Sequence, residues 1–152
     1  MIIGKSNFLI CGIGEGEVAL SIYGIKEILW DVKVYSLPQV SDYIIGIFAD
    51  DKKLAVVIDL VKFFGISEEN KERILLKFKT DEILVFLAVK DVKEIIDVKE
   101  EEVYPCPPMF SSLIPNYYIS GLIKKEERFI PIIDVAKILA HEEIKPYTMI
   151  SK

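Results

Sequence analysis

Two aspartates at corresponding places in the chain, Asp59 and Asp134, are the first residues that could do chemistry. A pair of carboxylates can supply a general acid and a general base when their environments differ. Each aspartate, however, follows an apolar strand-like run and precedes a short helical pattern, which is where an aspartate caps a helix through its carboxylate. Neither has the Ser/Thr-Gly neighbours of aspartic-protease loops. We therefore interpret both as helix caps.

One histidine and two cysteines are the remaining candidates for catalysis. His141 lies at the predicted end of a charged helix, and no nucleophile or orienting carboxylate stands at a defined spacing from it. Cys106 lies among prolines, with no histidine or helix N-terminus nearby that would activate its thiol. Cys11 and Cys106 are too few for a disulfide framework, and no His/Cys/Asp spacing places three metal ligands on one face. We expect no catalytic residue, no metal and no cofactor.

The glycine-rich segment Gly12–Gly16 has the composition of a phosphate-binding loop. A dinucleotide-binding loop requires a helix directly after its glycines, with the helix N-terminus facing the phosphate. Here a strand-like run at 18–22 follows, and another precedes the glycines at 7–13. We predict a hairpin turn at this position.

The composition favours a compact globular protein, since 51% of the 152 residues are hydrophobic and 28% are charged. The net charge of −5 and the absence of a basic cluster argue against nucleic-acid binding. No apolar run approaches the ~18 residues that a membrane helix needs. We expect a cytoplasmic protein that associates with a membrane only through a partner.

Much of the chain occurs twice. Residues 43–64 align without a gap onto residues 118–139, and six of the 22 positions are identical. A second echo pairs Leu20–Leu29 with Leu87–Ile96, where the sequence Lys-Glu-Ile recurs at a spacing of 67. This period is too long for a solenoid repeat and indicates a duplicated β-rich unit.

The pattern along the chain predicts about ten short strands and two short helices. Expected strands include 32–37, closed by a proline, and 92–98, which has a pattern typical of a bulge. The expected helices follow Asp59 and Asp134, the second reaching residue 143. Short strands with helices at equivalent places favour two small barrels side by side. We place one subdomain at about 14–85 and the other at about 86–143, together with the N-terminal strand 7–13.

The chain resembles the CheW-like adaptor domain of bacterial and archaeal chemotaxis. The resemblance rests on the order and spacing of short apolar motifs over roughly residues 7–143. These are Phe8-Leu9-Ile10, Leu20-Ser21-Ile22, Ile25-Lys26-Glu27-Ile28, Leu37-Pro38, Tyr43-Ile44-Ile45-Gly46, Val57-Ile58-Asp59-Leu60, Leu87-Ala88-Val89, Gly121-Leu122-Ile123 and Phe129–Asp134. The resemblance implies one domain over 1–152, mostly β, built as two five-stranded SH3-like barrels with short helices.

The resemblance also implies a function, that of a non-enzymatic adaptor that couples chemoreceptors to a CheA-type histidine kinase. One surface of the first barrel would dock on the regulatory domain of the kinase, and a groove between the barrels would hold the cytoplasmic tip of a receptor. The family positions tied to these contacts correspond here to Ile25, Glu27 and Gly46.

The hairpin 49–52 departs from the family pattern. The family reads Asn-Leu-Arg-Gly, whereas this chain reads Ala49-Asp50-Asp51-Lys52. The arginine tied to signalling is replaced by Asp51, and the lost glycine at Lys52 is expected to change the turn, because glycine adopts positive φ at little cost. We add Asp50 and Asp51 to the candidate partner-binding residues. A paralogue that binds the kinase but no longer binds receptors is the alternative within the family.

Two other classes of function stay open at this point. A generic SH3-like interaction module would bind an extended segment on clustered exposed aromatic residues, for which the chain offers Trp30, Tyr35, Tyr117 and Tyr118. A small-molecule enzyme would need convergent polar groups in a cleft between the barrels.

Overall fold

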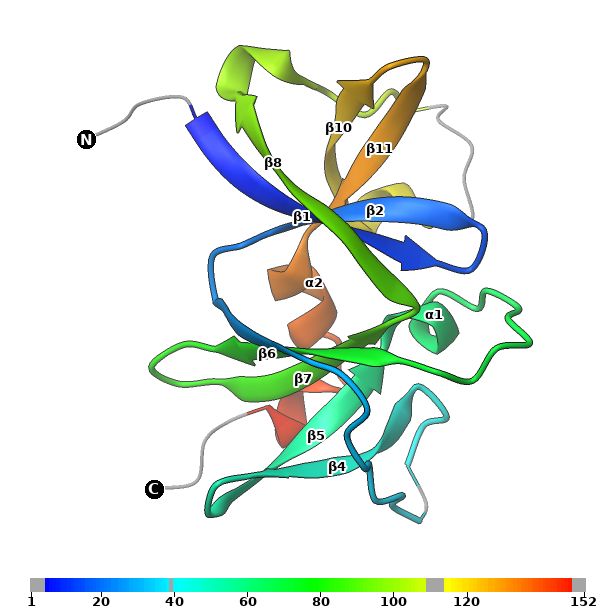
Figure 1. The fold of residues 1–152 in the computed structure, drawn as a ribbon, viewed down its shortest axis with the longest axis vertical. Helices are drawn as coiled ribbons and strands as arrows, with labels where there is room; N and C mark the ends of the chain where they lie inside the picture. Colours follow the sequence, from blue (N-terminus) through cyan, green and yellow to red (C-terminus); the bar gives the residue numbers. More distant parts are fainter. Residues whose placement is uncertain (1–4, 39, 109–113, 149–152) are drawn as a thin grey trace.

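The computed structural model describes residues 5–38, 40–108 and 114–148 (Figure 1). The strands are β1 (Lys5–Ile13), β2 (Gly16–Ser21), β3 (Ile25–Leu29), β4 (Ile44–Asp50), β5 (Lys53–Asp59), β6 (Ile74–Lys79), β7 (Leu84–Val89), β8 (Asp91–Lys99), β9 (Val103–Tyr104), β10 (Ile119–Lys125) and β11 (Arg128–Ile133). The helices are α1 (Leu60–Phe63) and α2 (Val135–Leu139), with 3-10 turns η1 (Glu100–Glu102), η2 (Asn116–Tyr118) and η3 (Lys145–Tyr147).

The strands form two sheets, which confirms the prediction of a mostly β fold. One sheet has six strands in the order β8-β1-β2-β11-β10-β9, and the other has five in the order β3-β6-β7-β5-β4. Figure 1 shows the six-stranded sheet above the five-stranded one, with α2 between them. We call the five-stranded unit the first barrel and the six-stranded unit the second barrel.

The two repeats pair their strands in the same register. Leu9 pairs with Leu20 between β1 and β2, and Leu76 pairs with Leu87 between β6 and β7, so both partners shift by 67 residues. Hairpins β4–β5 and β10–β11 correspond at a shift of 75, and each has an irregularity at the same place, just before the glycine. The structure therefore confirms the internal duplication.

The repeats exchange strands with each other. β1 and β2 belong to the first repeat but pair with β8 and β11, whereas β6 and β7 belong to the second repeat but pair with β3 and β5. The parallel pairs β2–β11 and β5–β7 join each exchanged hairpin to the other repeat. The subdomain boundaries expected at residues 14 and 85 therefore differ from the sheet boundaries. The tight turn after Ile13 keeps β2 with β1 in the second barrel, and β7 continues to Val89 in the first.

Three apolar clusters hold this arrangement together. The core of the first barrel contains Phe86 and Leu75, and that of the second contains Ile10 and Ile130. The largest cluster lies between the barrels and draws buried residues from both repeats. A helix turn from each repeat, α1 and α2, packs into this shared core through residues such as Leu60 and Ile138.

Two predicted elements differ from the structure. The expected strand 32–37 is reduced to a single bridge between Tyr35 and Ile47, whose amides and carbonyls exchange hydrogen bonds of 2.9 and 2.7 Å. This segment lies beside the outer strand β4, and its valines turn inward to the first barrel's core rather than extending the ladder. The second helix ends at Leu139, before the expected residue 143. The predicted bulge in 92–98 is confirmed opposite Ile10.

Candidate protein-docking surfaces

The strand β3, which carries two predicted partner-binding residues, is an edge strand of the first barrel. Ile25 pairs with Phe78 of β6, and its half-buried side chain packs against the core between the barrels. Glu27 lies opposite Lys77 in the same pair of strands and is exposed. Because an edge strand presents unpaired backbone groups, this edge can be covered by another protein.

Gly46, the third predicted partner-binding residue, lies where the backbone leaves no room for a side chain. It follows the irregularity in β4, where the chain passes close to Tyr35. A Cβ at this position would lie 2.2 Å from the carbonyl oxygen of Tyr35 and 2.8 Å from Cγ1 of Val34. Glycine is thus required for the close approach of the Val34–Tyr35 segment to β4.

The two aspartates at the tip of hairpin β4–β5, Asp50 and Asp51, have different surroundings. Asp50 ends β4 and its carboxylate lies 2.7 Å from Nζ of Lys77, with both side chains partly buried. Asp51 is exposed and has φ of 59°, as has the equivalent Glu126 with φ of 56°. The left-handed residue of the loop is therefore Asp51 and not Lys52, and the expectation based on the lost glycine was wrong. Aspartate is among the non-glycine residues that adopt this conformation most readily.

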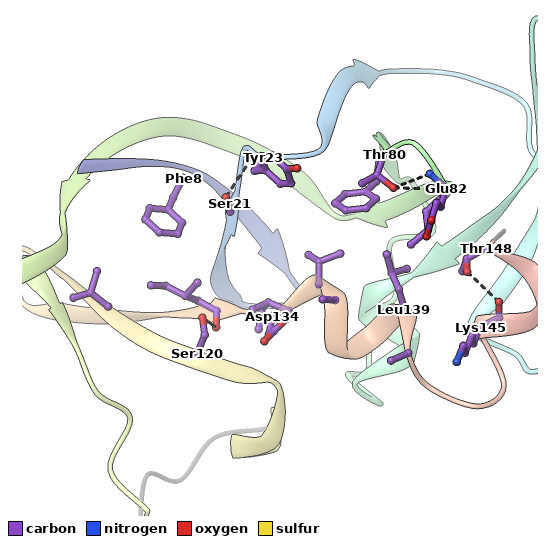
Figure 2. Close-up of a pocket in the computed structure, with 18 of the residues that line it drawn as sticks. Phe8, Ser21, Tyr23, Thr80, Glu82, Ser120, Asp134, Leu139, Lys145 and Thr148 are labelled. Carbon is purple, nitrogen blue, oxygen red and sulfur yellow. Dashed lines mark hydrogen bonds between the residues drawn. The ribbon is translucent and has the colours of Figure 1, made fainter. Parts of the chain in front are cut away.

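A groove of about 1150 Å³ lies between the barrels. Its apolar lining includes Phe8, Val98 and Ile132 from the second barrel, and Phe78 and Ile83 from the first. Figure 2 shows Phe8, Ser21 and Ser120 at one end and Thr80, Glu82 and Lys145 at the other, with Asp134 and Leu139 between them. The groove is mainly apolar with polar groups at intervals, which suits an amphipathic protein segment.

The two candidate carboxylates are helix caps, as predicted. Asp59 accepts hydrogen bonds from the amides of Val61 at 2.9 Å and Lys62 at 3.3 Å, and Asp134 accepts one from Lys137 at 3.2 Å. Asp59 also forms a buried ion pair with Arg73, with 3.0 Å between Oδ2 and Nε. Each carboxylate is thus occupied by its own cap.

His141 and Cys11 are held by packing and burial. His141 packs edge-on against Tyr43 and Phe63, and its Nδ1 accepts a hydrogen bond from the amide of Glu143. Burial, with a smaller contribution from the charge of Asp91, raises the pKa of the Cys11 thiol to about 12. Among residues 5–38, 40–108 and 114–148, no cluster of three potential metal-ligating side chains is present.

The four aromatic residues considered for an SH3-type peptide groove do not form one cluster. Trp30 and Tyr35 are exposed on the first barrel, and Lys33 stacks on Tyr35. Tyr118 instead joins Phe63 and other rings between the barrels and contacts Tyr117. In the part of the chain that the structure describes, no ring contact links the two groups.

Two lysines, Lys77 and Lys125, were not among the residues singled out from the sequence, although each forms an ion pair near a hairpin tip. Lys77 holds Asp50, and Lys125 of the second barrel forms an ion pair with Glu94. The repeated Lys-Glu-Ile sequence already marked Glu94 as the equivalent of Glu27, but its partner Lys125 could be found only from the fold.

Comparison with known proteins then decides the family, since the model for the CheW-like domain matches residues 7–143. The chain belongs to the CheW-like domain family. The chemotaxis protein CheW of Klebsiella aerogenes is 30% identical over 142 residues, which cover 91% of this chain and 84% of that protein. The chemotaxis protein CheW of Helicobacter pylori is 29% identical over 130 residues, which cover 84% and 77%.

A solved CheW-like structure agrees with this assignment. The crystal structure of the scaffolding protein TtCheW from Thermoanaerobacter tengcongensis matches with a TM-score of 0.77 at 27% identity, covering 85% of this chain and 88% of that chain. The chain is thus a chemotaxis scaffold of a non-enzymatic family. Within the described residues, every helix is too short or too polar to cross a membrane.

Proposed function

We propose that this CheW-like protein is a cytoplasmic adaptor that couples chemoreceptors to a CheA-type histidine kinase. The observation that carries the proposal is that the β3 edge and the groove between the barrels adjoin each other at Phe78. Ile25 on the β3 edge pairs with Phe78, and Phe78 also lines the groove between the barrels. One chain could therefore hold a partner on the edge and a second partner in the groove at the same time.

The kinase would bind the β3 edge of the first barrel through its regulatory domain. Ile25 supplies an apolar contact at the start of the edge, and Glu27 supplies a charge two residues further on. A small apolar patch with a polar rim is typical of protein interfaces. Asp51, exposed at the neighbouring hairpin tip, would belong to that rim.

The receptor would bind in the groove between the barrels. A receptor tip that presents an amphipathic helix could place its apolar side on Tyr23, Ile83 and Val103, which line the groove and are at least partly exposed. The polar groups at the ends of the groove, Glu82 and Lys145 among them, would then fix its orientation.

Co-sedimentation with the cognate kinase, in the presence and absence of a receptor fragment, tests the proposal. Ile25→Asp should weaken binding to the kinase regulatory domain by about 2 kcal/mol or more, because it places a charge in the apolar centre of the contact. Its binding to the receptor fragment should be unchanged. Unchanged affinity of Ile25→Asp for the kinase domain by calorimetry would place the interface elsewhere.

A paralogue that binds the kinase but not receptors is the second candidate. It is favoured by the acidic hairpin tip, where Asp50 and Asp51 replace the family's leucine and arginine. Like charges opposed across an interface cost binding, so a reversed charge at this tip alters the choice of partner. Kinase binding without receptor binding in the same sedimentation assay would select this candidate.

A further inference from the structure

An ion pair within the chain joins hairpin β10–β11 to strand β8 at one end of the second barrel, which we call its mouth. Lys125, at the end of hairpin strand β10, contacts the carboxylate of Glu94 on the edge strand β8. Glu94 shares one face of β8 with Ile96 and Val98, and both of these pack into the core of the second barrel. The pair therefore joins the hairpin to the edge strand directly above that core.

The first barrel has the same geometry but different charges. The shifts of 67 and 75 residues place Glu27 where Glu94 lies and Asp50 where Lys125 lies. Both positions in the first barrel are thus acidic, and the cation comes from β6 instead. Lys77, which takes the place of the buried Ile10, directs its ammonium group to Asp50 at 2.7 Å.

Within the described residues, Glu27 forms no ion pair. It is exposed, and the ion pair at this mouth joins Lys77 to Asp50 and not to Glu27. Lys77 is engaged by Asp50, whereas Glu94 and Lys125 pair with each other. Glu27 also shares a face of β3 with Leu29, which packs on the core of the first barrel. A protein that covers this edge would remove water from the exposed Glu27 carboxylate, which is unfavourable unless the partner supplies a cation.

We infer that the protein docked on the first barrel places a lysine or arginine beside Glu27, in the position that Lys125 holds beside Glu94 within the chain. This inference rests on the proposed docking of the kinase regulatory domain at the β3 edge, and it specifies the chemistry of that contact. In the second barrel the cation beside Glu94 is Lys125 of the same chain. In the first barrel the cation beside Glu27 comes from the partner protein.

The duplication provides a matched pair of variants for the test. Glu27→Gln and Glu94→Gln make the same change at equivalent exposed positions, and the purified kinase regulatory domain is the binding partner in calorimetry. Glu27→Gln should weaken binding about ten-fold at low salt, which corresponds to ~1.4 kcal/mol. The loss should shrink at high salt because screening reduces the attraction. Glu94→Gln should bind within about two-fold of the wild type, since Glu94 already has its cation.

A second variant mimics the partner within the chain. Asp50→Lys places a lysine where Lys125 stands in the second barrel, so it should satisfy Glu27 and weaken binding about as much as Glu27→Gln. In the Glu27→Gln background the same lysine should have little further effect. Additive losses would show that it repels the partner without acting on Glu27, and would overturn the inference.

The Ile25→Asp variant separates the two hypotheses. If Ile25→Asp loses binding while Glu27→Gln binds like the wild type at both salt concentrations, the kinase docks at the edge but brings no cation to Glu27, and the inference is wrong. If Ile25→Asp binds normally, the docking site itself is wrong and the inference falls with it. Overlapping thermal melting curves for Glu27→Gln, Glu94→Gln and the wild type are required for either conclusion.

Discussion

Asp59→Ala should destabilise the protein far more than Asp134→Ala, although the duplication places both residues at the start of equivalent helices. Loss of a helix cap costs about 0.5–2 kcal/mol, and this is the whole cost expected at Asp134, whose side chain makes one amide contact at 3.2 Å. Asp59 additionally holds Arg73 in an ion pair whose side chains are only 3% and 8% exposed. Removing one partner of a buried pair costs about 3–5 kcal/mol.

The lower end of that range is expected for Asp59→Ala, because the Arg73 guanidinium keeps two carbonyl acceptors, at Asn70 and Glu72. A loss of about 3 kcal/mol should lower the melting temperature by about 6–12 °C in a protein of this size. Urea unfolding measures both variants, and Arg73→Met in the Asp59→Ala background should recover part of the loss. Equal destabilisation by Asp59→Ala and Asp134→Ala would show that the buried pair adds nothing to the cap.

Two further changes probe the backbone and the buried thiol. Gly46→Ala should lower the free energy of unfolding by about 1–3 kcal/mol in denaturant unfolding, because its Cβ would lie 2.2 Å from a backbone oxygen. Gly16→Ala is the control and should be nearly neutral, since no atom lies within 4 Å of the added Cβ. Similar losses for both variants would contradict the close approach at Gly46. Because burial raises the pKa of Cys11 from 9.0 to about 12, the folded state holds this proton longer than the unfolded state, so its contribution to stability is complete below about pH 9 and is lost as the pH rises toward 12. Iodoacetamide at pH 8 should therefore label Cys106 and leave Cys11 intact in the folded protein, as mass spectrometry can show; rapid labelling of Cys11 would refute its burial.

The sequence predicted the features that depend on local patterns. The hairpin and helix of residues 43–64 recur at 118–139 because apolar alternation and the capping aspartates act over a few residues. The bulge in β8 and the hairpin after Ile13 follow from similarly local signals. These features are repeated in the two halves because the halves have the same pattern.

The features that the sequence did not predict depend on distant contacts. The pairing of β2 with β11 joins residues 19 and 132, and no local pattern selects one parallel partner over another. The same limit applies to Asp50 on β4, whose ion pair with Lys77 on β6 forms only when these two strands come together in the fold. The candidate partner-binding residues stay a prediction, and the ion pairs around them could be assigned only from the fold.

The exchange of strands between the repeats has a consequence for how this protein can fail. The segment between α1 and β6 is the natural place to cut a duplicated chain, yet a cut there leaves each fragment with strands of both barrels and a complete set of neither. In the uncut protein, each repeat contributes a hairpin to the barrel of the other repeat. We therefore expect that neither barrel can unfold while the other stays intact. The protein should lose its β3 edge and its groove in a single cooperative transition, so a cell would contain copies that are either fully folded or entirely unfolded.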